Sequence, residues 1–107
     1  MPACVQWANL SSSEKRFDWD ASKNAENRAK HGVAFTQAQY AFADPNRVIA
    51  EDTAHSEKEK RYCCFGEVDA GVVTLRFTYR DSLIRIFGAG DWRKGKAIYE
   101  RENQIHQ

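Results

Sequence analysis

The sequence lacks a dominant charge and a long apolar run. Sixteen basic residues face fifteen acidic ones, a formal net charge of +1, so no global field draws the chain to nucleic acid or membrane, and any site for a polyanion must come from local clustering. No apolar run approaches the roughly 18 residues of a membrane span, and the N-terminal residues lack the basic start and apolar stretch of a signal peptide. We therefore expect a soluble, cytoplasmic protein without a membrane partner.

Patterns typical of metal and cofactor sites are also missing. The three cysteines are an odd number, and Cys63 and Cys64 are adjacent, without the paired spacing of a zinc site. The three histidines are scattered, and the glycines at 88 and 90 do not complete a dinucleotide-binding fingerprint. We predict neither a metal nor a cofactor.

The first half of the chain has the signals of helices. Residues 1–16 show no sustained hydrophobic period and are interpreted as an N-terminal extension. The 42% hydrophobic content of the chain is enough for one core, so residues 17–107 are expected to form a single domain. Asp20 can cap a first helix that ends at Gly32, and Thr36 can cap a second that ends at Asp44 and Pro45.

Beyond Pro45 the composition changes to β-branched and aromatic residues. Four strands are predicted in RVIAE, KRYCCFGEV, GVVTLRFTYR and SLIRIFGA, and the short connections at 69–71 and 80–82 predict antiparallel hairpins. A final helix is expected from about Trp92. The expected fold is therefore α+β, with two N-terminal helices, a four-stranded antiparallel sheet and a C-terminal helix, and with the helices on one face of the sheet.

Alternation along the strands predicts a basic face. In the third predicted strand, one face would carry the core residues Val73, Leu75, Phe77 and Tyr79, and the other would carry Thr74, Arg76, Thr78 and Arg80. If the second face also holds Arg61 and Arg85, with Phe65 and Phe87 between them, it suits phosphates and unpaired bases of RNA. A half-solvated sheet also exposes arginines without any function, so this alternative stays open.

Cleavage of RNA requires more than binding. A 2′-hydroxyl must lose its proton, the charge on the phosphorane must be neutralised, and the leaving 5′-oxygen must gain a proton. Arginine can neutralise the charge. His55, Glu59, Lys94 and Tyr99 are the candidates for the proton transfers, and the residues alone do not choose among them.

Several ordered motifs resemble the BrnT family. They are FDWD at Phe17–Asp20, KHGVAF at Lys30–Phe35 and FADP at Phe42–Pro45, then Asp52, His55–Ser56, Glu59, Arg61 and Gly66 in a DxxHSxxExRxxxxG pattern, and finally YRDSLIRIF with Tyr99–Glu100. The resemblance extends from Phe17 to about Glu102.

The resemblance implies a RelE-like ribonuclease toxin that cleaves RNA without a metal and arrests translation. It also implies a BrnA-like antitoxin with a ribbon-helix-helix domain, so that operator DNA is contacted only through the antitoxin. His55, Glu59, Arg61, Arg80 and Arg85 become candidate catalytic residues. Arg76, Phe65, Phe87, Lys94 and Tyr99 are candidate RNA-binding residues.

One segment departs from the family pattern. Many relatives continue from the last strand as ISARKATRRE, whereas residues 87–96 of this chain read FGAGDWRKGK. The departure leaves an alternative function open, in which a catalytically degenerate homologue only binds an antitoxin or RNA.

Overall fold

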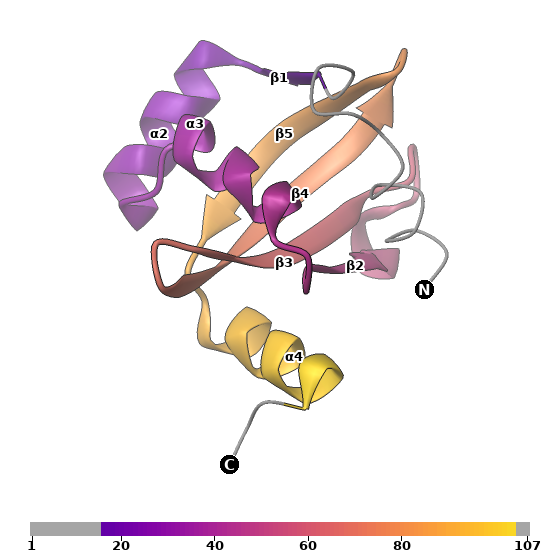
Figure 1. Cartoon of the computed structure of the whole chain (residues 1–107). Coiled ribbons are helices and arrows are strands. Elements are labelled where there is room, and N and C mark those ends of the chain that lie inside the picture. The colour runs from indigo at the N-terminus through magenta and orange to yellow at the C-terminus, as the bar shows by residue number, and fades with distance from the viewer. Residues whose placement is uncertain (1–15, 105–107) are drawn as a thin grey trace.

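A five-stranded mixed sheet organises the part of the chain that the computed structural model describes, residues 16–104 (Figure 1). Its strands are β1 (Phe17–Trp19), β2 (Val48–Glu51), β3 (Tyr62–Val68), β4 (Gly71–Arg80) and β5 (Leu83–Gly90), in the order β1-β5-β4-β3-β2. Strands β2 to β5 form the predicted antiparallel meander. The α+β class is confirmed.

The prediction of four antiparallel strands is wrong, because β1 adds a fifth strand that runs parallel to β5. Phe17 pairs with Ile84 and Trp19 with Ile86. A strand of three residues is too short to show a period in the sequence. The predicted extension over residues 1–16 lies outside the described residues except for Arg16, whose carbonyl accepts a hydrogen bond from the Ile84 amide.

The first helix, α2 (Ala21–His31), has the predicted ends. The Asp20 carboxylate accepts hydrogen bonds from the amides of Ser22 and Lys23, and Gly32 ends the helix with a φ of 73°. These contacts are local in sequence, which is why the sequence predicts them.

The second helix differs from the prediction. It is a short α3 (Phe35–Ala38) followed by a 3₁₀ helix, η2 (Gln39–Ala43), and its N-cap is Ala34 and not Thr36. The Phe35 amide instead donates to the Asn24 side chain of α2 at 2.8 Å. Burial of Phe35, which is fully inaccessible, places the helix start before Thr36. The predicted end at Asp44 is confirmed.

The main core lies between the sheet and these N-terminal helices. Leu75, Phe77, Ile84 and Ile86 are buried against Phe42 and its neighbours. Tyr79, which alternation assigns to the same face, is 44% exposed because it lies near the end of β4, where the core no longer covers it. Its assignment to the core is corrected accordingly.

The C-terminal helix α4 (Arg93–Asn103) begins after Trp92, as predicted, but covers the opposite face of the sheet. Gly95 lies against Phe65 and Thr74, and Tyr99 joins Phe65 and Val48 in a second buried cluster. Figure 1 shows α4 apart from α2 and α3. The prediction that all helices share one face is therefore wrong. No helix within residues 16–104 combines the length and the apolar character needed to cross a membrane.

Candidate functional site

The sheet register brings charged residues into one row on the face away from the main core. Asp18 pairs with Arg85, and Arg85 pairs with Thr78 on the next strand. Arg61, directly before β3, follows in the same row, and its carbonyl accepts a hydrogen bond from the Asp52 amide at 2.7 Å. Two arginines thus lie between two aspartates across the width of the sheet.

A β-bulge places Phe87 among the arginines. Arg76 pairs with Gly88 and Phe77 with Ile86, so Phe87 is the extra residue of β5. The guanidinium carbons of Arg61 and Arg76 lie 4.4 and 5.3 Å from the centre of its ring. Cation–π attraction holds both side chains at the sheet surface, and the ring serves as a support for two cations.

Several cationic side chains next to this ring line a small pocket of about 120 Å³. Arg61, Arg80, Arg85 and Lys23 line it together with Glu59 and Phe87. The Glu59 carboxylate accepts from Arg80 at 3.2 and 3.3 Å, and Arg85 donates to Asp18 at 2.5 Å. The arginines are thus held in place while remaining partly accessible, since Arg80 is 52% and Arg85 28% exposed in its side chain.

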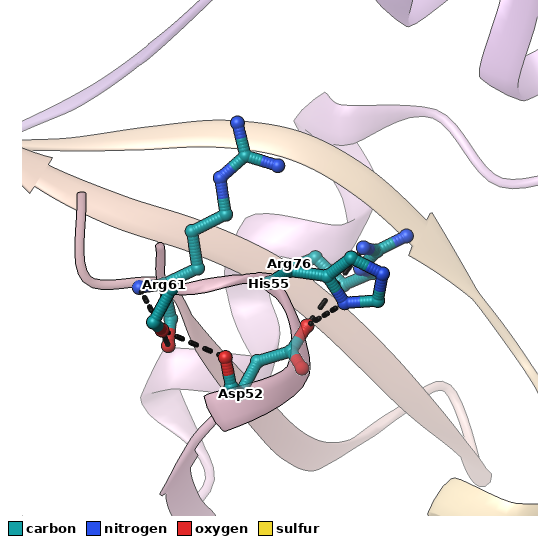
Figure 2. Close-up of polar contacts among 5 residues, drawn as sticks. Asp52, His55, Arg61 and Arg76 are labelled. Carbon is teal, nitrogen blue, oxygen red and sulfur yellow. Dashed lines mark hydrogen bonds and ion pairs between the residues drawn. The ribbon is translucent and has the colours of Figure 1, made fainter. Parts of the chain in front are cut away.

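Asp52 links His55 to the arginine cluster (Figure 2). Its Oδ2 lies 2.9 Å from His55 Nδ1 and 3.8 Å from Arg76 Nη2. His55 ends the short 3₁₀ helix η3 (Thr53–His55), and the hydroxyl of the next residue, Ser56, ties this turn to Arg61. A His ring held through Nδ1 presents Nε2 for proton transfer.

The five predicted catalytic residues therefore lie in two adjoining depressions. His55, Glu59 and Arg61 line one of them, and Glu59, Arg61, Arg80 and Arg85 line the other. Among the predicted RNA-binding residues, Arg76 and Phe87 join this surface, and Lys94 lies nearby on α4 beside a larger groove.

Phe65 and Tyr99 do not belong to this surface. Phe65 is 5% and Tyr99 3% exposed, because α4 packs over this part of the sheet. The Tyr99 hydroxyl donates to Asp44 at 2.6 Å. Burial and this carboxylate raise the pKa of Tyr99 well above its ordinary value. Both side chains therefore pack under α4, and their predicted contact with RNA stays a prediction.

Sequence reasoning missed Asp18 and Asp52 as site residues. Asp52 precedes His55 by three residues, which is the spacing of a helical turn and was a usable signal. Asp18 gives no such signal, because its partner Arg85 lies 67 residues away. Within residues 16–104, no cluster of three or more His, Cys, Asp or Glu side chains could hold a metal ion.

Residues 19–95 match the model of a family described as the ribonuclease toxin, BrnT, of type II toxin-antitoxin systems. The matched range contains His55, Glu59 and all the arginines of the two depressions. No curated protein matches the sequence.

Proposed function

Because the chain belongs to the BrnT family of ribonuclease toxins, we propose that it cleaves RNA, without a metal ion, on the face that carries Arg61, Arg80 and Arg85. The observation that supports this proposal is the convergence of three guanidinium groups with Glu59 in one pocket. Guanidinium groups bind phosphate oxygens bidentately and stay charged, so they can neutralise a phosphorane as a metal ion otherwise would.

The proposed reaction assigns the two proton transfers to Glu59 and His55. Glu59, oriented by Arg80, accepts the proton of the 2′-hydroxyl as the 2′-oxygen attacks phosphorus. The bond from phosphorus to the 5′-oxygen then breaks, and His55, protonated and held by Asp52, gives its proton to the leaving oxygen. Arg61 and Arg85 stabilise the charge that develops between these two steps.

The rest of the basic surface would position the RNA. Arg76 lies beside Phe87 at the edge of the arginine cluster, and Lys94 is exposed at the first turn of α4. Both can contact phosphates on either side of the cleaved bond, and such contacts orient a strand without reading its sequence.

The toxin family implies an antitoxin partner. We propose a BrnA-like antitoxin with a ribbon-helix-helix domain. In the cytoplasm it would cover the arginine surface, formed by Arg61, Arg76, Arg80 and Arg85, and inhibit the toxin until the antitoxin is removed. Operator DNA would be contacted only through that partner.

Expression tests the proposal directly. The chain produced alone should arrest bacterial growth and fragment cellular RNA, and co-expression of the protein encoded beside it should restore growth through a tight complex. Normal growth with intact RNA, at verified levels of folded protein, would instead support the degenerate homologue that only binds.

The metal-independent part has its own test. The purified toxin should cleave RNA at the same rate before and after addition of EDTA. Loss of cleavage on chelation, with recovery when a divalent ion is added to protein that stays folded, would overturn this part alone.

A further inference from the structure

A groove of about 780 Å³ runs between α4 and the strands β2 to β4, beside the arginine surface. Its walls are mostly apolar and include Val48, Ala50, Cys63, Trp92 and Ile98. Its volume falls within the roughly 300–1,000 Å³ of pockets that bind small organic ligands. An open apolar groove of this size is large enough for a planar ring system.

The groove adjoins the proposed cleavage site through shared residues. His55 lines both the groove and the depression that holds Glu59 and Arg61. Arg76 also lines the groove, while its guanidinium lies over Phe87 together with that of Arg61. If an RNA strand binds Arg61 through one phosphate, its next nucleotide can therefore reach the groove.

Three carboxylates and three cations line the groove, and one of these cations is left for an anionic ligand. Each of its three carboxylates already has a basic neighbour: Glu51 faces Lys60, Asp52 faces His55 and Arg76, and Glu102 faces Arg101. Lys94 has no ion-pair partner among the described residues and lies at the groove. It can neutralise a phosphate on the groove side of the cleaved bond.

From these observations we propose that the groove binds an unpaired nucleobase of the RNA, next to the phosphate held at Arg61. The proposal deepens the proposed function and rests on it. Trp92 and Ile98 would contact the faces of the base, and Arg76 and Lys94 its flanking phosphates. The groove would then contribute to which sequence is cut.

The experiment compares nucleotides with the same sugar phosphate lacking a base. The full-length toxin, freed of co-expressed antitoxin, is titrated with AMP, with UMP and with ribose 5-phosphate, and the methyl resonances of Val48 and Ile98 are followed by NMR. At least one nucleotide should shift both signals, and ribose 5-phosphate should not. Equal shifts from the sugar phosphate, or no shift from either nucleotide, would overturn the proposal.

A matched pair of variants tests the groove in RNA. Ala50→Trp adds bulk at an exposed position that lines the groove, and Ala97→Trp adds the same bulk at an exposed position of α4 outside the residues that line it. We expect Ala50→Trp to weaken binding of single-stranded RNA by about tenfold and to change the preferred cleavage sequence, while Ala97→Trp matches the wild type. Thermal unfolding of both variants identifies any loss of fold.

The outcomes separate the groove from the proposed activity. Wild-type protein that binds a nucleotide in the groove but leaves RNA intact would contradict the ribonuclease function and support the groove. If Ala50→Trp binds and cuts RNA like the wild type but loses the antitoxin, the groove is the antitoxin's docking site and the nucleobase proposal is wrong.

Discussion

The sheet face that lies away from the main core has two halves, one under α4 and one beyond it. Side chains alternate along the strands in the same way in both halves, but their exposure differs. Under α4, Phe65 and Thr74 are each 5% exposed and pack against Gly95. Beyond the helix, Arg76 and Phe87 stay partly accessible and form the charged surface. Alternation therefore assigns a side chain to a face, but a helix from a distant part of the chain decides whether that side chain packs or can meet a ligand.

A mutation on the core face of the sheet serves as the reference for both halves of the opposite face. It should have the largest effect on stability. Leu75→Ala removes a fully buried side chain beneath the N-terminal helices and should cost about 2–5 kcal/mol of unfolding free energy. Urea unfolding measures this loss. Cleavage per folded molecule should remain normal at low temperature, and a loss below about 1 kcal/mol would contradict the core assignment.

The uncovered half should show the opposite result. Arg61→Ala, Arg80→Ala and Arg85→Ala should each slow RNA cleavage by about 100- to 1,000-fold, or about 2.7–4 kcal/mol of transition-state stabilisation, by analogy with loss of an oxyanion donor. Their stability should change by less than about 0.5 kcal/mol because the side chains are partly exposed. The readouts are single-turnover cleavage and thermal unfolding.

Arg28→Ala is the matched control for these variants. Arg28 is an exposed arginine in the last turn of α2, outside both depressions, and its loss should leave cleavage unchanged. If the Arg61, Arg80 and Arg85 variants cleave RNA like the wild type, or lose cleavage only because they unfold, these arginines have a structural role and do not take part in cleavage.

The covered half should be sensitive to the distance between α4 and the sheet. A Cβ at Gly95 would lie 1.9 Å from the Thr74 hydroxyl and 3.2 Å from the Phe65 ring. Gly95→Ala should therefore cost about 1–3 kcal/mol, although alanine in a free helix is about 1 kcal/mol better than glycine.

A double mutant locates the cause of that loss. Combining Gly95→Ala with Thr74→Ala removes the hydroxyl that the new methyl group meets, so part of the stability should return. Full additivity of the two losses in chemical unfolding would show that the contact between Gly95 and Thr74 is not responsible.

The smallest effect concerns Asp44, which anchors α4 through Tyr99. Burial opposes its ionisation, but hydrogen bonds from the Tyr99 hydroxyl and the amides of Glu67 and Asn46 outweigh it, so the pKa of Asp44 is lowered. A lowered folded-state pKa stabilises the fold above the unfolded value of about 4, and this stabilisation is lost as the pH falls further.

Replacing Tyr99 by Phe should reveal this dependence on pH. The variant should lose about 1 kcal/mol at pH 7, and its difference from the wild type should shrink below about pH 4 as Asp44 becomes protonated. Chemical unfolding at several pH values is the measurement, and a difference that stays constant in acid would exclude Asp44 as the relevant partner.

Local signals in the sequence predicted much of the fold. Asp20 and Gly32 bound the first helix through contacts within a few residues, and the short turns produce the meander. The same register brings Arg61, Arg80 and Arg85 to one surface. Each of these features depends on neighbours in the sequence or on adjacent strands.

The missed features depend on partners far along the chain. Strand β1 exists through its pairing with β5, and the cap of α3 comes from Asn24 in another helix. Burial of Phe65 and Tyr99 follows from where α4 docks, which the period of β3 does not specify. In the site, Asp18 is likewise determined by Arg85.

The parallel pairing of β1 with β5 also sets an order of assembly. During synthesis β1 emerges first, but Phe17 has no strand partner until Ile84 has been added. At roughly 5–20 residues per second this delay lasts several seconds. Contacts of such long sequence separation form late in folding, because loop closure must come first. A nascent chain that stalls after Arg80 therefore carries Arg61 and Arg80 without Arg85, and the pocket that these three arginines line is completed only near the end of translation.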